Sequence, residues 1–351
     1  MNLHESFLIV ILISFISTFL LRKFKTFQDI NSPRTHKHFI KKNSNATLSG
    51  GLILILSIFI LLPQNLILFK FFSFLIFLTG IVSDINILHS PRLRFIFQTL
   101  VLFLSIKFLN IYILDIRVDF LNNLLENNNI SYLFVLFCIL ILINGTNFID
   151  GVNTSVIGYY ILVILSVLFV SKLYALNVNQ DFFIKLLIIM SVLYLLNIFG
   201  ILFLGDSGSY LLAYIVGLSL INFYNQNPIV SPYYVVCLLW YPAYENLFSI
   251  LRKLITRKSP SIADNQHLHH YIYSYISKHI KKKILCNSAT GFIICFYNLL
   301  FFIIIFNNFS FTFTLITYLS INILIYNILF LYLQKNLSIK KRKIIYFYIF
   351  L

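Results

Sequence analysis

The sequence is a succession of long apolar runs separated by short polar segments. A helix that crosses a bilayer needs about 20 predominantly apolar residues, with a range of about 17–25. By this measure the pattern predicts about 10–11 transmembrane helices and an all-α polytopic membrane protein. The eleven runs are 6–21, 50–69, 70–83, 95–114, 130–148, 156–175, 182–203, 207–222, 230–251, 288–306 and 309–333. At the second boundary, Pro63 and Gln64 offer an alternative turn to Lys70.

Composition agrees with this prediction and excludes a soluble domain. Of the residues, 59% are hydrophobic and 11% are charged, whereas soluble domains carry about 25% charged residues. Arg22 and Lys23 follow the first apolar run without a small-residue cleavage site, so we expect a retained span and no removed signal peptide. The four cysteines show neither metal-site nor disulfide spacing, and we interpret them as small core residues.

The net charge of +16 is explained by membrane topology, so nucleic acid is not needed as a partner. Eleven spans put the termini on opposite faces, and all but five of the 27 Lys and Arg residues fall in the loops and C-terminal tail of one face. The positive-inside rule then places the N-terminus outside and the C-terminus in the cytoplasm. We expect one integral-membrane domain over 1–351, with an active site formed by the cytoplasmic loops 22–49, 84–94, 144–155, 204–206 and 252–287.

Four carboxylates lie at or just inside the cytoplasmic boundary of predicted spans: Asp84, Asp150, Asp206 and Glu245. Ionisable groups at that depth are costly and usually functional, although each one alone could also cap a helix. Asp206 lies in the sequence Gly-Asp-Ser-Gly-Ser at the start of a span, where a helix N-terminus attracts phosphate. Carboxylates at such a place suit Mg²⁺, which binds one or two carboxylates together with substrate phosphates.

Two further groups of polar residues lie on the same predicted face. Asn147 and Asp150 are three residues apart and share a side if that turn is helical. A tract of three histidines follows the loop after Arg252: His267, His269 and His270. Zinc is one interpretation of this tract, but no Cys, Asp or second His pair completes a tetrahedral site. We favour contacts of these imidazoles with a diphosphate or sugar hydroxyls, because four cations lie nearby in the sequence: Arg252, Lys253, Arg257 and Lys258.

In this order, five short motifs resemble those of the polyprenyl-phosphate N-acetylhexosamine-1-phosphate transferases (glycosyltransferase family 4). They are Ser49-Gly50-Gly51, Gly80–Asp84 continuing to Arg94 and Gln98, Asn147–Gly151, Gly205–Ser209 and His267–His270. The last is similar to the His-x-His-His loop of the undecaprenyl-phosphate GlcNAc-1-phosphate transferase branch. Two departures stand out, because Ser83 replaces the usual first aspartate of its pair and Asn153 replaces an aspartate of many members.

The resemblance implies transfer of a sugar-1-phosphate, such as N-acetylhexosamine-1-phosphate, from a UDP-sugar to undecaprenyl or another polyprenyl phosphate, with release of UMP. It implies a cytoplasmic-face site in the bacterial inner membrane, a product that starts a cell-envelope glycan such as an O antigen, and Mg²⁺ as cofactor with Mn²⁺ as the alternative. Asp206 is then the principal metal ligand, and Asp84 completes the metal shell or holds the acceptor phosphate. Asn147 and Asp150 orient the donor's ribose-diphosphate. The sugar and developing phosphate charge would be bound by Arg252, His267, His269 and His270, and a phosphate oxygen by Ser83.

Two other functions remain open from the sequence. A multi-span secondary transporter would also carry intramembrane carboxylates, but its polar groups are expected near mid-membrane, whereas these motifs gather at one interface. An inactive or lipid-binding homologue is the second alternative, because Ser83 cannot act as a carboxylate base. The motifs leave the sugar open between GlcNAc, GalNAc and a 6-deoxy or diamino relative.

Overall fold

The computed structural model describes residues 2–24, 46–85, 87, 90–257, 259 and 266–337. The predicted loops 22–49, 84–94 and 252–287 and the C-terminal tail therefore lie partly outside the described residues. Within the described part the protein is all-α. Thr47 and Leu202 form an isolated β-bridge that belongs to no sheet.

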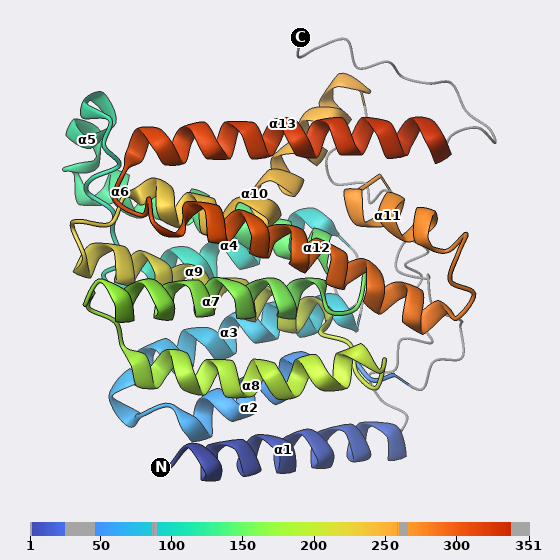
Figure 1. Ribbon diagram of the computed structural model, residues 1–351. Coiled ribbons are helices and arrows are strands. Elements are labelled where there is room, and N and C mark those ends of the chain that lie inside the picture. The colour runs from blue at the N-terminus through green and yellow to red at the C-terminus, as the bar shows by residue number, and fades with distance from the viewer. Residues whose placement is uncertain are drawn as a thin grey trace.

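The long helices run roughly along one common direction (Figure 1). They are α1 (Leu3–Lys23), α2 (Gly50–Leu61), α3 (Ile67–Asp84), α4 (Pro91–Phe108), α6 (Asn128–Ile149), α7 (Ser155–Leu173), α8 (Gln180–Ile198), α9 (Gly205–Gln226), α10 (Pro232–Ile255), α12 (Lys283–Phe306) and α13 (Thr312–Leu337). Three short helices connect them: η2 (Gln64–Leu66), α5 (Asp119–Leu125) and α11 (Leu268–Ile276). Each predicted apolar run corresponds to one of the long helices.

Eight segments of the described chain are long and apolar enough to cross a membrane, with α2 as a shorter apolar helix. The expectation of an all-α, multi-pass membrane protein is confirmed. The outermost helices α1 and α13 bury only 22% of their apolar stretch each, so most of their side chains are left for lipid (Figure 1). Helix α9, in contrast, buries 89% of its stretch and is surrounded by the other helices.

The boundary expected at Lys70 is wrong, and the break lies at Pro63 instead. Helix α2 ends at Leu61 because the proline lacks the N–H that would continue the helix. Lys70 lies within α3, and its Nζ donates hydrogen bonds to the carbonyls of Phe59 (3.0 Å) and Leu62 (2.7 Å). The lysine thereby satisfies carbonyl groups that the end of α2 leaves without partners.

Several ranges expected as loops are helical near the site. Helix α4 starts at Pro91, four residues before the predicted run, because proline suits the first helical position and Ser90 caps it. Residues 144–149 and 252–255 likewise belong to α6 and α10. Polar residues continue these helices because they face other protein elements and a pocket, where lipid does not select against them.

A close approach between α3 and α9 brings the first two motifs together. A Cβ atom on Gly80 would lie 2.2 Å from Cα of Ser207, so only glycine permits this packing. Gly205 begins α9 with φ of +74°, in the left-handed region that glycine adopts without strain. The end of α3 is therefore held directly against the start of α9.

The bundle has two distinct ends. The N-terminus and α5 lie at one end, whereas α11 lies at the opposite end (Figure 1). The predicted site residues lie at the α11 end of the bundle. His269 of α11 covers Gly151, which directly follows α6, and the end of α3 packs against the start of α9.

Candidate active site

Asp84 closes the N-terminal end of α9. Its Oδ1 accepts a hydrogen bond from the backbone N–H of Asp206 (2.9 Å), and its Oδ2 accepts one from Ser207 (3.0 Å). These N–H groups have no partner within the helix, and the N-terminus carries partial positive charge, so a carboxylate is stabilised there. The predicted pairing of Asp84 with Asp206 is thus present, through the backbone of α9.

Ser83 lies between a cation and a carboxylate. The buried Ser83 Oγ donates to Oδ2 of Asp206 at 2.6 Å and accepts from Nη1 of Arg94 at 2.5 Å. Sequence reasoning did not assign Arg94 a role. The Ser90-Pro91 start of α4 is the signal that could have placed it, because Arg94 then lies in the first turn of that helix. Its Nε is buried and has no hydrogen-bond partner within the described residues.

The carboxylates at α9 fit a magnesium site completed by substrate. Asp206 is 1% exposed, and Asp84 is bound to its backbone. A pair of carboxylates matches the way Mg²⁺ is usually held by one or two carboxylates together with substrate phosphates. Nowhere in the described ranges do three or more His, Cys, Asp or Glu side chains form a group able to hold a metal. A zinc site in the histidine tract therefore has no ligand set among these residues.

The end of α6 contributes Asn147 and Asp150. Asn147 is in the last turn of α6, and Asp150 is its C-cap residue. Oδ1 of Asn147 is a buried acceptor that has no hydrogen-bond partner in the described part of the chain. Asp150 lines a pocket, whereas Asn147 does not, so the two residues face different surroundings.

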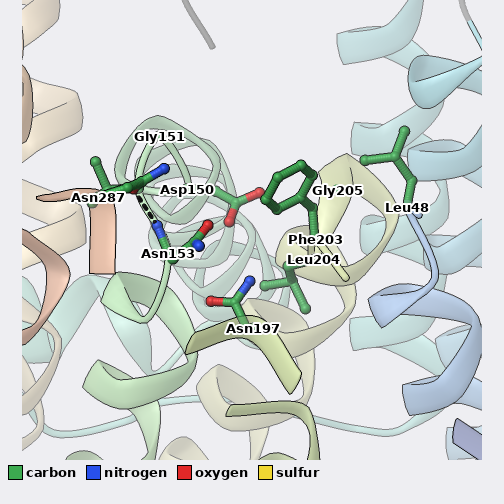
Figure 2. A pocket seen from close by; sticks show the side chains of 10 residues that line it. Leu48, Asp150, Gly151, Asn153, Asn197, Phe203, Leu204, Gly205 and Asn287 are labelled. Atoms are coloured by element: carbon green, nitrogen blue, oxygen red, sulfur yellow. Dashed lines mark hydrogen bonds between the residues drawn. The ribbon is translucent and has the colours of Figure 1, made fainter. Parts of the chain in front are cut away.

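This pocket lies between the loop after α6 and the start of α9. Its enclosed volume is about 50 Å³, and Figure 2 shows Asp150 in its middle, beside the ring of Phe203. The lining residues are Leu48, Asp150, Gly151, Val152, Asn153, Asn197, Phe203, Leu204, Gly205 and Asn287. It joins the Asp150 loop to Gly205, the residue before Asp206.

Three asparagines shape the wall of the pocket. The backbone N–H of Asn153 donates to Oδ1 of Asn287 at 2.8 Å, the contact dashed in Figure 2. Oδ1 of Asn197 accepts from the backbone N–H of Thr154 at 2.6 Å, where φ is +68°. Nδ2 of Asn153 is buried and has no hydrogen-bond partner among the described residues. Sequence reasoning missed Asn197, Phe203 and Asn287, although single asparagines in apolar runs are a weak signal for buried polar contacts.

The histidine segment is held by Glu245 and packs against the end of α6. Oε2 of Glu245 lies 3.0 Å from Nδ1 of His267, and Oε1 accepts from the backbone N–H of Leu268 at 3.2 Å. The rings of His269 and His270 are 4.1 Å apart between centroids. His269 covers Gly151 so closely that a Cβ there would lie 2.3 Å from its Nε2. The three predicted histidines are therefore together, beside the Asp150 loop.

Two cations of α10 are buried beside this segment. Arg252 and Lys253 are each 4% exposed. Arg252 donates to the carbonyl of Gln266 and thus holds the start of the histidine segment, with its guanidinium 5.9 Å from the ring of Phe248. Nζ of Lys253 lies 5.6 Å from the ring of Phe148, which is two residues before Asp150 in the sequence. Sequence reasoning named both Arg252 and Lys253 near the histidines and selected only Arg252 as a site residue.

A comparison with known sequences gives a family match for part of the chain. The family model of Glycosyl transferase family 4 matches residues 66–224. This stretch of the chain is similar to that family. Over 232 residues, which are 63% of the chain and 62% of the relative, it is 25% identical to a probable undecaprenyl-phosphate N-acetylglucosaminyl 1-phosphate transferase of Bacillus subtilis. Over 77 residues, 22% of the chain and 25% of the relative, it is 38% identical to an undecaprenyl-phosphate alpha-N-acetylglucosaminyl 1-phosphate transferase of Thermotoga maritima. The matches thus span less than two thirds of each relative's length.

The family 4 match confirms the resemblance of the motifs and covers only part of the site. Ser83, Asp84, Asp150 and Asp206 lie inside the matched range, whereas Arg252 and the histidines follow it. The structure joins the two parts, because His269 packs on Gly151 and the pocket connects Asp150 with Gly205. The site thus has three parts. The first is the pair of carboxylates, Asp84 and Asp206, at the start of α9, and the second is the pocket. The third, which we call the cationic group around α11, consists of Arg252, Lys253, His267, His269 and His270.

Proposed function

We propose that the protein transfers a sugar-1-phosphate from a UDP-sugar to undecaprenyl or another polyprenyl phosphate and releases UMP. The observation that carries this proposal is the pair of carboxylates at the N-terminus of α9, at one end of a membrane-embedded bundle. Its relatives in Bacillus subtilis and Thermotoga maritima are named as enzymes that act on undecaprenyl phosphate. A donor from the aqueous phase and an acceptor in the bilayer would meet at such an end.

We assign Mg²⁺, with Mn²⁺ as the alternative, to Asp206 and Asp84. When bound there, the metal supplies positive charge to the phosphates during phosphoryl transfer. Ser83 orients Asp206 through its hydrogen bond, and Arg94 adds a guanidinium whose buried Nε can donate to a phosphate oxygen. The acceptor phosphate has a second pKa of about 6 and is largely ionised at neutral pH, so no carboxylate base is required in place of Ser83.

We assign the nucleoside part of the donor to the open side of the pocket, because the enclosed space itself is too small for it. Nδ2 of Asn153 can donate to a carbonyl of the base, and the ring of Phe203 offers an aromatic face at the mouth. Asp150 lies between this pocket and α9, where it can orient the ribose-diphosphate. Asn147 does not line the pocket, but its buried Oδ1 can accept a hydrogen bond from the donor substrate beside it.

The cationic group around α11 fits the sugar and its phosphate. Lys253, His267, His269 and His270 are buried beside the Asp150 loop. Lys253 can donate a hydrogen bond to a phosphate or hydroxyl oxygen, and each imidazole can donate to or accept from a substrate group according to its tautomer. Arg252 orders this group through the carbonyl of Gln266.

We place the site at the cytoplasmic face of the bacterial inner membrane, with the N-terminus outside. Exposed Lys282 follows α11 at the site end, whereas exposed Asn128 begins α6 beside α5 at the other end. The distribution of Lys and Arg supports the cytoplasmic assignment of the site end. The donor nucleotide is available on that face.

In intact cells, a membrane-impermeant maleimide is expected to label the Asn128→Cys variant but not the Lys282→Cys variant. Both should react after lysis. The unmodified protein provides the control for its own four cysteines. Labelling of Lys282→Cys from outside would reverse the orientation and remove the cytosolic donor from the proposal.

Transfer itself is tested by incubating the purified protein with Mg²⁺, undecaprenyl phosphate and a panel of UDP-sugars. We expect UMP release that depends on the lipid and on one sugar of the panel. Lipid binding without UMP release from any donor would favour a lipid-binding homologue. Movement of a solute across proteoliposomes, again without UMP release, would favour a transporter.

A further inference from the structure

Glu245 is a buried carboxylate that none of the roles above explains. Its side chain is 0% exposed in α10, and its two oxygens contact two groups of the histidine segment. Oε2 lies 3.0 Å from Nδ1 of His267, and Oε1 accepts from the N–H of Leu268. A carboxylate in such a place is retained only when its oxygens are satisfied by donors.

One of these contacts fixes the backbone of the histidine segment. The first N–H groups of α11 lack partners within the helix, and His267, its N-cap residue, makes no side-chain cap of its own. Oε1 of Glu245 supplies the missing acceptor at Leu268. Helix α11 therefore begins at a place that α10 determines.

The other contact fixes the ring of His267. The ring is packed against Phe148 with 5.2 Å between centroids and lies parallel to His269 at 5.5 Å, with an angle of 7°. His267 is 5% exposed. Packing restricts the plane of the imidazole, and the bond to Glu245 selects which nitrogen lies toward α10.

We propose that Glu245 is a positioning residue that keeps a proton on Nδ1 of His267 and so makes Nε2 the acceptor nitrogen of the ring. An ionised carboxylate only accepts hydrogen bonds, and the backbone N–H of Leu268 at Oε1 favours this ionised form. Nδ1 must therefore be the donor, and the neutral imidazole presents Nε2 as an acceptor. That Nε2 accepts from a hydroxyl of the sugar rests on the proposed function, whereas the position of the proton does not.

The variant Glu245→Gln removes the negative charge at position 245 and should change the tautomer of His267, while the side chain keeps nearly the same shape. Glutamine has one carbonyl and one NH₂ group in place of two acceptor oxygens. When its carbonyl accepts from Leu268, its NH₂ group faces Nδ1 of His267 and requires that nitrogen to accept. The proton then moves to Nε2, as happens when an amide replaces the carboxylate beside a catalytic histidine.

Solid-state NMR of protein with ¹⁵N-labelled histidine in lipid bilayers measures this directly. The signal of His267, assigned by its loss in His267→Gln, is expected as Nδ1–H in the unmodified protein and as Nε2–H in Glu245→Gln. Glu126→Gln, an exposed residue after α5, is the matched control and should leave the signal unchanged. An Nε2–H signal in the unmodified protein, or an unchanged signal in Glu245→Gln, would overturn the proposal.

Kinetics of the same variants test the consequence for transfer. We expect Glu245→Gln to lower kcat about 100-fold, with the KM of the UDP-sugar nearly unchanged, as for other partners that orient a functional histidine. In a His267→Gln background the same change should cost little more, because the two residues act as a unit. Additive losses would contradict a role through His267.

Two further outcomes distinguish failure of this proposal from misfolding of the variant and from failure of the proposed function. If Glu245→Gln fails to fold, Glu245→Asp retains a carboxylate and should retain the Nδ1–H signal, and loss of that signal would count against the proposal. If the unmodified protein transfers no sugar-1-phosphate, the proposed function fails, but the NMR result still decides whether Glu245 controls the tautomer.

Discussion

Asp206→Asn is expected to abolish transfer, lowering kcat by on the order of 10³-fold, while the protein still inserts and folds. Asp206 is 1% exposed, and its Oδ2 accepts from Ser83, a hydroxyl that can also accept from the new amide. The fold is therefore retained. Loss of the charge removes a metal ligand and several kcal/mol of transition-state stabilisation, at about 1.4 kcal/mol for each tenfold.

The measurement is the initial rate of UMP release at limiting Mg²⁺. Asp181→Asn is the matched control, because Asp181 has the same charge, starts α8 and pairs with Lys185 at 2.7 Å away from the site. It should transfer at the normal rate. Near-normal transfer by Asp206→Asn at limiting Mg²⁺ would refute the assignment of Asp206 to the metal.

Asp84→Asn is expected to lower kcat by about 10³-fold, whereas Ser83→Ala lowers it by only about tenfold. Asp84 accepts from two N–H groups of α9, and it supplies the carboxylate that this motif retains. An asparagine loses the charge and places an NH₂ group against one of these donors. Ser83 provides one hydroxyl between Arg94 and Asp206, and these two can approach each other directly when it is removed.

Separate KM values for both substrates decide between two roles of Ser83. If the hydroxyl mainly orients Asp206, both KM values stay nearly unchanged in Ser83→Ala. If it binds the acceptor phosphate, the KM for polyprenyl phosphate rises strongly while that for the UDP-sugar does not. Equal losses of kcat in Ser83→Ala and Asp84→Asn would contradict both roles.

The spans were predictable because lipid imposes a one-dimensional rule on the sequence. Each stretch must be apolar over a fixed length and satisfy its own backbone, and the eleven runs accordingly became helices. The predicted boundary at Lys70 was wrong because hydropathy does not show that the long lysine side chain can reach carbonyls at the end of the preceding helix. The early start of α4 depended on capping chemistry at Ser90 and Pro91.

The site was predictable as far as its residues belong to local motifs. Asp84 and Asp206 are adjacent, as expected, because glycine at position 80 lets α3 reach α9. The roles of Arg94, Lys253 and Glu245 depend on contacts between distant segments, which no local pattern encodes. The buried asparagines of the pocket are single residues within apolar or mixed stretches, and their function depends on what they face.

The most direct test of the account follows the two phosphorus atoms of the donor. With purified protein, Mg²⁺, undecaprenyl phosphate and each UDP-sugar of the panel labelled with ³²P in the phosphate next to the sugar, we predict that the label of one donor enters the lipid. With the phosphate next to uridine labelled, the label should leave as UMP, in equal amount to the lipid product. Label in neither product, or a lipid that gains the sugar without its phosphate, would contradict transfer of a sugar-1-phosphate.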